Sequence, residues 1–345
     1  MIRLFLIRHG ETVDNVAQVY AGRRDSDLTN HGFHQGTRLG QWFANRNVKF
    51  THIFSSTLKR AHKTAQLIAD AQKPSDPSTT EVTKVEVTPL GLLQEQDYGS
   101  YEGQPFSVRR FSDRQDVRES HPTPGSENSG FVDVESKESM AQRADEFIGD
   151  YLVSLCASAE VDQEIVVAVV AHGIILSVLW KRFLQQLDRN SVSLAQDLQG
   201  PKAPVSLEHH LGAFSNTGFL ELDMSKNPKP TRLLETTTKH TAVDPNQFDA
   251  LLPTEGSFPA GKDDEAPAKE PHNSDCSESK NATSQEIAGA PPSYPMLHGW
   301  TTEIRAINCK DHLNGLKRTG RGVGSARHDE TQKTMDSFFK RQKRE

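Results

Sequence analysis

Two stretches of the sequence run from apolar residues directly into a histidine followed by a glycine. In the first, LFLIRHGETVDN, these are His9 and Gly10, and Arg8 stands immediately before them. In the second, EIVVAVVAHG, they are His172 and Gly173. A neutral imidazole can attack without a strong base, and an arginine stays charged at any working pH. Together these side chains predict chemistry on an anionic group.

A third stretch, FSSTLKRAHKTA at residues 54–65, places Arg60 just after a short candidate strand. Sites in open α/β sheets lie at the carboxyl ends of strands, so we expect His9, His172, Arg8 and Arg60 to meet in one crevice. Two guanidinium groups suit bidentate recognition of a phosphate. Each residue taken alone is more often structural, but four of them at the ends of three candidate strands predict a phosphate-ester site.

The oxygen that leaves a phosphate ester needs a proton. The stretch LLQEQDYGSYEG, at residues 92–103, offers three carboxyl groups on what we expect to be a loop: Glu95, Asp97 and Glu102. A buried carboxylic acid at this place could protonate the leaving oxygen. Residue types and spacing do not choose among the three.

The elements that must position these residues alternate between strands and helices. We expect strands at residues 2–7, 52–56, 84–90, 165–171, 217–224 and 300–308. We expect helices from Thr29, over residues 58–71 and 139–157, and directly after the second His-Gly pair. The continuous apolar runs at 2–7 and 165–171 are typical of strands buried on both faces of a parallel sheet. The sequence therefore predicts an α/β layered fold.

The composition predicts that part of the chain does not fold. Of 345 residues, 34% are hydrophobic, which is low for a globular domain. Residues 239–298 are rich in Pro, Ser, Asp and Glu and are expected to be a disordered insertion. We assign the catalytic domain to residues 1–238 and its last strand and end to 299–316. Residues 317–345 are expected to be a flexible basic tail.

Charge and cysteine content indicate where the protein works. Residues 305–345 contain eleven Lys or Arg and five Asp or Glu, a local net charge of +6, so the remainder of the chain carries −12. A basic tail on an acidic body predicts a docking or targeting segment. The three cysteines are scattered, which is typical of a reducing compartment, and no apolar run reaches the roughly 20 residues of a membrane helix. We expect a cytoplasmic protein without a membrane partner, with the nucleus as a further location.

Four motifs, in this order, resemble those of the histidine phosphatase (phosphoglycerate mutase-like) superfamily: LIRHGET followed by Asn15, FSSTLKRAHKTA, LLQEQDYGSYEG and VVAHG. The stretch DSDLTNHGFHQG at residues 25–36 resembles the usual second block of that family. The resemblance spans residues 4–224. It implies a three-layer α/β/α fold around a mostly parallel central sheet, with no metal and no cofactor.

The resemblance also assigns roles to single residues. It implies that His9 is the nucleophile that becomes phosphohistidine. Glu95, which stands four residues before Gly99 as the motif requires, fits the proton donor of the family. The resemblance implies that four further side chains bind the phosphoryl group of a small phosphorylated substrate: Arg8, Asn15, Arg60 and His172.

The sequence departs from the pattern of the family in two places. Gly173 is followed by Ile174, where many members have a second glycine. Residues 123–139 match the Gly-Gly-Glu-Ser block of the family only imperfectly. The spacing from Glu135 to Arg143 fits the family pattern best, with an insertion before Glu135. This region helps to cap the pocket in the family, so the segment bears on the identity of the substrate.

Two further stretches, NVKFTHIFSSTLKR at 47–60 and INCKDHLNGL at 307–316, resemble the TIGAR branch of the superfamily. That resemblance implies a bisphosphatase that acts on fructose 2,6-bisphosphate or on other small phosphorylated sugars and acids. A mutase, which returns the phosphoryl group to the substrate, uses the same chemistry and is the alternative.

The tail contains a short pattern of a different kind. Residues 332–339, QKTMDSFF, resemble the box that binds the DNA sliding clamp (PCNA), and a chance match is the alternative. The pattern consists of Gln332, Met335, Phe338 and Phe339, of which the last three would form a hydrophobic plug. The basic flank could instead serve nuclear import, and we expect no direct sequence-specific binding to nucleic acid. A nuclear clamp-associated factor whose phosphatase fold is secondary is therefore the second class of function.

Overall fold

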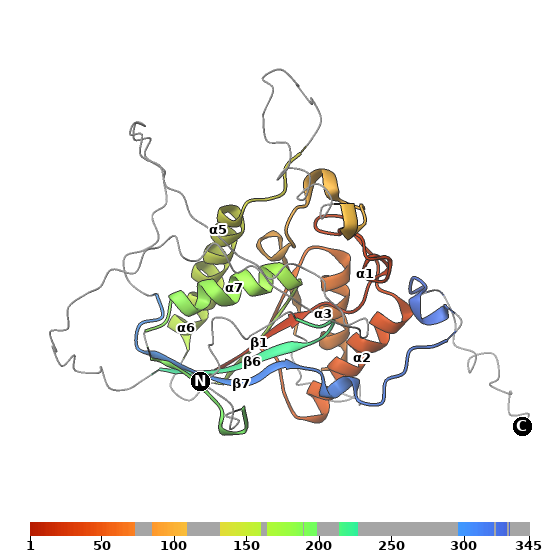
Figure 1. Cartoon of the computed structure of the whole chain (residues 1–345). Helices are drawn as coiled ribbons and strands as arrows, with labels where there is room; N and C mark the ends of the chain where they lie inside the picture. Colours follow the sequence, from red (N-terminus) through yellow and green to blue (C-terminus); the bar gives the residue numbers. More distant parts are fainter. Residues whose placement is uncertain are drawn as a thin grey trace, which may run out of the picture. The chain divides into compact units, whose positions relative to one another are not determined.

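The computed structural model describes residues 1–72, 85–108, 132–159, 164–188, 190–198, 214–226, 296–320, 322–329 and 331. All of these belong to the unit formed by Met1–Lys229 with Pro292–Glu345. Their strands form one sheet in the order β3-β2-β4-β1-β6-β7-β5 (Figure 1). The strands are β1 (Ile2–Arg8), β2 (His52–Ser56), β3 (Val87–Leu90), β4 (Ile165–Ala171), β5 (Val192–Leu194), β6 (Phe219–Lys226) and β7 (Trp300–Cys309).

The sheet is mostly parallel, as expected. β3, β2, β4 and β1 all run in the same direction, whereas β6 is antiparallel to both β1 and β7. The edge strand β5 is parallel to β7. The carboxyl ends of β1, β2, β3 and β4 therefore meet at one edge of the sheet.

Helices cover both faces of this sheet (Figure 1). They are α1 (Val13–Ala17), α2 (Asn30–Asn45), α3 (Lys59–Ala71), α5 (Lys137–Phe147), a π-helical turn (Ile148–Val153), α6 (Ser154–Ser158) and α7 (Gly173–Gln185). Short 3-10 turns occur at Gly91–Leu93, Gly99–Tyr101, Gln196–Leu198, Asp311–Leu313 and Val323–Ser325. Residues of α2 and α3 share a core with Phe5 and Ile7, while α5 and α7 pack with Leu4 and Leu6. This arrangement confirms the three-layer α/β/α fold.

The two central strands are apolar on both faces because each face meets a layer of helices. Every residue of β4 is buried, and its register with β1 pairs Ile2 with Ile165 and Arg8 with Ala171. On the α2 side the core is aromatic. Phe43 lies 5.0 Å from Phe5 between ring centroids, in an edge-to-face contact of the kind that adds to simple burial.

Most of the expected elements are present, and the differences have local causes. α1 was not predicted because it is only five residues long; its start is held by a capping box in which Thr12 and Asn15 bond to one another's backbone. β5 was not predicted because its three residues show no periodicity. The single helix expected over 139–157 is divided by a π-helical turn.

Two described residues from the expected insertion and tail contact the rest of the domain. Leu297, which we assigned to the insertion, is fully buried and donates its N–H to the Gln186 carbonyl at 3.0 Å. In the expected tail, His328 stacks on Phe33 with ring centroids 3.7 Å apart. Apolar and aromatic side chains at these positions bind the segments to the domain. Residues 239–295 and 332–345 lie outside the described residues.

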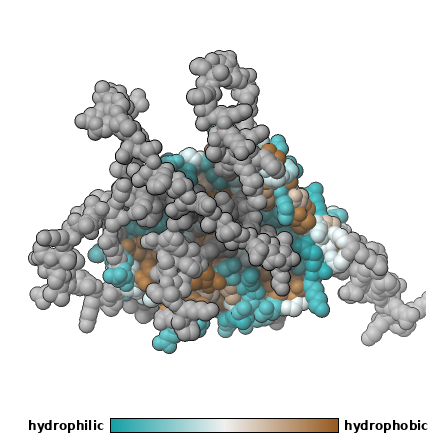
Figure 2. Space-filling view, viewed as in Figure 1, coloured by the Kyte–Doolittle hydropathy of each residue, from teal (hydrophilic) through white to brown (hydrophobic). Residues whose placement is uncertain are grey.

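Every helix in the described part of the chain is too short or too polar to cross a bilayer. On the face that Figure 2 presents, hydrophilic and hydrophobic residues are interspersed.

Candidate active site

The register of β1 with β4 brings the two His-Gly pairs together. Because Arg8 pairs with Ala171, the next residue of each strand is a histidine, and the His9 N–H donates to the Ala171 carbonyl at 3.0 Å. The imidazole rings of His9 and His172 lie 5.1 Å apart between centroids. Both side chains are buried.

The hydrogen bond of His9 fixes which of its nitrogens carries the proton. Nδ1 lies 2.7 Å from the Gly10 carbonyl oxygen, which can only accept, so Nδ1 is assigned as the donor. Nε2 then carries the lone pair. Burial lowers the pKa of His9 well below 6.5, and the nearby Arg60 and Arg8 guanidinium groups lower it further. His9 is therefore neutral at neutral pH with an unprotonated Nε2.

His172 has the opposite tautomer. Arg60 Nε donates to His172 Nδ1 at 3.1 Å, so the proton of this imidazole lies on Nε2. Within the described residues, His172 Nε2 has no hydrogen-bond partner although it is buried. Burial, followed by the charge of Arg60, lowers the pKa of His172 well below 6.5. His172 is thus a neutral imidazole with an N–H available to an anion.

Arg60 is buried in a cage of backbone oxygens. Its Nη1 donates to the Arg24 carbonyl at 2.8 Å, and its Nη2 donates to the carbonyls of Ala21 and Gly22, each also at 2.8 Å. With Nε on His172, four of its five N–H groups are committed, and one on Nη1 remains. Arg60 therefore serves mainly to orient His172 and to supply positive charge. With one N–H left, it cannot bind a phosphate through two parallel hydrogen bonds.

Arg8 and Asn15 come from the same segment as His9. Arg8 Nη1 donates to the Phe214 carbonyl at 2.7 Å, and a Cβ added at Gly173 would lie 3.8 Å from Arg8 Cζ. Asn15 Oδ1 accepts from the Thr12 backbone N–H at 3.2 Å. Because its oxygen is occupied, the amide nitrogen is the group that Asn15 can offer to an anion.

Glu95 lies at the amino end of α7, which begins directly after His172. Its Oε2 accepts from the N–H of Ile174 at 3.1 Å, and its Oε1 accepts from those of Ile175 at 3.1 Å and Gln96 at 3.0 Å. A carboxylate offers about four acceptor positions, so one position, on Oε2, remains for a proton.

The other two candidate carboxylates serve the backbone of neighbouring loops. Glu102 accepts from the N–H groups of Gly22 at 3.0 Å, Arg23 at 2.9 Å, Arg24 at 3.2 Å and Tyr98 at 3.1 Å, and so holds the loop that surrounds Arg60. Asp97 accepts from the Gly99 N–H at 2.8 Å and pairs with Arg23 at 3.4 Å. Of the three, Glu95 is the one in direct contact with the helix that His172 precedes.

An ion pair behind Glu95 fixes the loop that carries it. Arg143 Nη2 lies 2.8 Å from Glu135 Oε2, and Arg143 Nη1 donates to the carbonyls of Leu92 at 2.8 Å and Gln94 at 3.0 Å. The backbone on both sides of Leu93 is thereby tied to α5. The spacing from Glu135 to Arg143 noted in the sequence corresponds to this pair.

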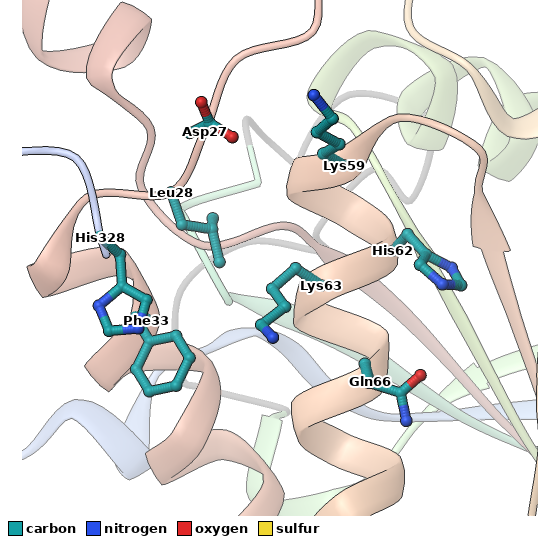
Figure 3. Close-up of a pocket in the computed structure, with 8 residues that line it drawn as sticks. All are labelled: Asp27, Leu28, Phe33, Lys59, His62, Lys63, Gln66 and His328. Atoms are coloured by element: carbon teal, nitrogen blue, oxygen red, sulfur yellow. The ribbon is translucent and has the colours of Figure 1, made fainter. Parts of the chain in front are cut away.

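A separate hollow of about 300 Å³ lies between α2 and α3 (Figure 3). Its lining residues are Asp27, Leu28, Phe33, Lys59, His62, Lys63, Gln66 and His328, none of which is a predicted site residue. Its charges have partners: Lys59 pairs with Asp25 at 3.5 Å, and Asp27 pairs with Arg327 at 2.9 Å. This hollow is not the place where the two histidines meet.

The remaining comparisons with the sequence concern the clamp-like box, a metal ion and one further residue. The four residues of the clamp-like box, Gln332, Met335, Phe338 and Phe339, lie outside the described residues. Among those described, no group of three or more His, Cys, Asp or Glu side chains is placed to hold a metal ion. Asn216 lies outside the predicted site residues, and its Nδ2 donates to the His9 carbonyl at 3.2 Å. Its signal was the turn-forming Asn-Thr-Gly just before β6.

Comparison with known proteins identifies the family of the chain. A model of the histidine phosphatase superfamily (branch 1) matches residues 4–200, more than half of the chain. The protein of Erwinia tasmaniensis named "Probable phosphoglycerate mutase GpmB" is 31% identical over 182 residues, which are 52% of this chain and 73% of that protein. The Saccharomyces cerevisiae "Broad-specificity phosphatase YOR283W" is 32% identical over 27% of this chain and 41% of its own length.

Among solved structures, Bacillus stearothermophilus YhfR aligns with a TM-score of 0.43 and 21% identity, over 65% of this chain and 91% of that one. The matched family model extends from the apolar run before His9 to beyond His172, and so includes the strands that carry both His-Gly pairs. The chain therefore belongs to the histidine phosphatase superfamily, branch 1.

Proposed function

We propose that the chain is a phosphomonoesterase that passes the phosphoryl group of a small phosphorylated metabolite through His9. The observation that carries this proposal is the buried, unprotonated Nε2 of His9 beside the available Nε2–H of His172. A nucleophile and an anion-binding N–H on adjacent strand ends suit attack on a phosphorus atom.

In the first half of the reaction, the His9 Nε2 lone pair forms a bond to phosphorus, and the bond from phosphorus to the ester oxygen breaks. Glu95, protonated on Oε2, gives its proton to that oxygen, so the alcohol leaves neutral and phosphohistidine remains. In the second half, the Glu95 carboxylate takes a proton from water as the water oxygen attacks phosphorus. The bond to His9 breaks, inorganic phosphate leaves, and both side chains return to their starting state.

Charge stabilisation comes from groups of the chain itself. The transferred phosphoryl group carries its charge on three equatorial oxygens in a loose transition state. Arg8, Arg60 and the His172 N–H supply fixed positive charge and a donor around it, and Asn15 adds an amide N–H. Because these groups are held before the substrate arrives, they need little reorganisation during the reaction. We propose that this set serves without a metal ion.

The substrate we propose is fructose 2,6-bisphosphate, cleaved at its 2-phosphate. Support comes from the resemblance of residues 47–60 and 307–316 to the TIGAR branch. Other small sugar and acid phosphates belong to the same class, and the name of the yeast relative, a broad-specificity phosphatase, agrees with a wider range.

A phosphoglycerate-type mutase is the alternative within the same chemistry. The name of the Erwinia tasmaniensis relative favours it. The two activities differ in the fate of the phosphohistidine, because a phosphatase gives it to water and a mutase returns it to a second hydroxyl group. Reaction in ¹⁸O-labelled water distinguishes them: a phosphatase releases labelled inorganic phosphate, whereas a mutase leaves the label in water.

His9→Ala is expected to lower kcat/KM on fructose 2,6-bisphosphate by about 10³-fold or more, because the covalent route is lost. The measurement is phosphate release across sugar bisphosphates, phosphoglycerates and phosphopeptides. His34→Ala is the matched control, since His34 is exposed on α2. Equal activity of His9→Ala and the unmodified chain would refute the proposed function.

Glu95→Gln is expected to lower kcat by about 10²-fold or more on an alkyl phosphate and far less on p-nitrophenyl phosphate, whose leaving group needs no proton. Asp97→Asn is the control and is expected to change both rates equally. If the loss in Glu95→Gln is the same on both substrates, or if Asp97→Asn shows the selective loss instead, Glu95 is not the proton donor.

Both active-site imidazoles are expected to stay neutral well below pH 6.5, because burial lowers the pKa of His9 and of His172. The neutral rings stabilise the folded state fully at pH values above about 6.5, which is the pKa of histidine in the unfolded chain. This stabilisation is lost as the pH falls through the lower pKa values that the two rings have in the folded protein. The measurement is ¹⁵N NMR of labelled histidine, with free histidine as reference. A midpoint near 6.5 for either ring would contradict the site electrostatics.

For the tail, we propose that residues 332–339 bind a DNA sliding clamp. The proposal is supported by the resemblance of their sequence to a clamp-binding box. Phe338→Ala/Phe339→Ala in the full chain is expected to abolish binding to the purified clamp and to leave phosphatase activity unchanged, because the aromatic plug is removed. Ser337→Ala is the matched control and is expected to bind. Failure of the unmodified chain to bind, or equal binding by the double variant, would contradict this proposal.

A further inference from the structure

The turn that leads into β6 contacts the nucleophile. Within residues 214–218, the Asn216 Nδ2 donates to the His9 carbonyl at 3.2 Å and to Asn15 Oδ1 at 3.2 Å. The Thr217 backbone N–H is shared between the Arg8 carbonyl at 3.1 Å and the His9 carbonyl at 3.2 Å. The carbonyl of the nucleophile is therefore held by two donors from a segment more than 200 residues away in sequence.

Thr217 adopts a backbone conformation that its side chain disfavours. Its φ is 56°, in the left-handed region, and the residue is fully buried. A branched Cβ makes this region costly, so such a residue persists only where its surroundings impose the conformation. A contact from a neighbouring segment must therefore hold Thr217 in this conformation.

His312 supplies the contact. It lies in the 3-10 turn Asp311–Leu313 directly after β7, and its Nε2 is 2.9 Å from Thr217 Oγ1. The Thr217 hydroxyl donates to the Asn216 carbonyl at 2.7 Å, so it accepts from His312, whose proton is thereby assigned to Nε2. Burial lowers the pKa of His312 to about 4, which keeps the ring neutral.

The surroundings of His312 hold the ring in place. Only 5% of the residue is exposed, and its ring stacks on Phe219 of β6 at an interplanar angle of 27°. Within the described residues, its Nδ1 has no hydrogen-bond partner. Its one side-chain hydrogen bond in that part of the chain is thus the one to Thr217.

We propose that Thr217 and His312 are positioning residues for His9: the His312 N–H fixes the strained turn, and the turn fixes the backbone of the nucleophile. This inference rests on the proposed function, in which His9 attacks phosphorus. It makes the turn Asp311–Leu313 a working part of the active site, because His312 contacts Thr217 and Thr217 contacts the backbone of His9.

The test uses the full chain with Thr217→Val and His312→Met, each of which removes one side of the hydrogen bond and keeps an apolar volume. Each variant is expected to lower kcat by about tenfold and to leave KM within about twofold, because misplacement of the nucleophile slows attack more than binding. The double variant is expected to be no slower than the slower single variant. His312→Gln retains an N–H donor and is expected to restore most of kcat.

Thr302→Val is the matched control, because Thr302 is also a buried threonine and its Oγ1 has no hydrogen-bond partner among the described residues. It is expected to keep the kcat of the unmodified chain. The inference is overturned if kcat per folded molecule is unchanged in Thr217→Val and His312→Met. It is also overturned if KM changes instead of kcat, or if His312→Gln is as slow as His312→Met.

A second readout needs no turnover. The Nδ1–H of His9, bonded to the Gly10 carbonyl, gives an NMR signal that reports the position of the ring. Thr217→Val and His312→Met are expected to shift or broaden this signal, and Thr302→Val to leave it unchanged. An unchanged signal in all three variants overturns the inference. If the unmodified chain cleaves no phosphate ester, the proposed function fails, and this readout still decides the positioning role.

Discussion

In the parallel register of β1 and β4, Arg8 pairs with Ala171, and the residue that follows each of them is a histidine. Every other part of the site is arranged around this pairing. The strands can stand side by side at the centre of the sheet because both are apolar on both faces and each face is covered by helices. A shift of the register by one residue would turn each side chain to the opposite face and separate the two imidazoles.

The second constraint is electrostatic, because two imidazoles and two guanidinium groups lie close together in a buried place. The site avoids repulsion between buried positive charges because both histidines are neutral and backbone carbonyls accept hydrogen bonds from the arginines. Arg60 directs four of its five N–H groups to backbone oxygens and to His172, and burial keeps both rings uncharged. The same contacts assign the two rings opposite tautomers, so that one offers a lone pair and the other an N–H. The positive charge of the site then comes from the arginines.

The sequence predicted what depends on local pattern. The apolar runs before His9 and His172 predicted the central strands. Because each histidine follows the carboxyl end of its strand, the sequence also predicted that the two histidines lie close together. The proposal of Glu95 over Asp97 and Glu102 rests on the family resemblance, because all three carboxyl groups lie close together in one stretch of sequence and their partners are visible only in the structure. The contact of His312 with Thr217 joins two distant segments through a strained turn, and no periodicity reports it. The packing of His328 on Phe33 was missed for the same reason.

In the proposed reaction, Nε2 of His9 carries the phosphoryl group between its two halves. The most direct measurement is to mix the chain with excess substrate, quench it in base within one turnover, and locate phosphohistidine by mass spectrometry and ³¹P NMR. We expect a single phosphorylated residue, His9, with phosphorus on Nε2, since Nδ1 donates to the Gly10 carbonyl. Phosphate on Nδ1 of His9, phosphate on His172, or turnover without any phosphohistidine would contradict the proposed reaction.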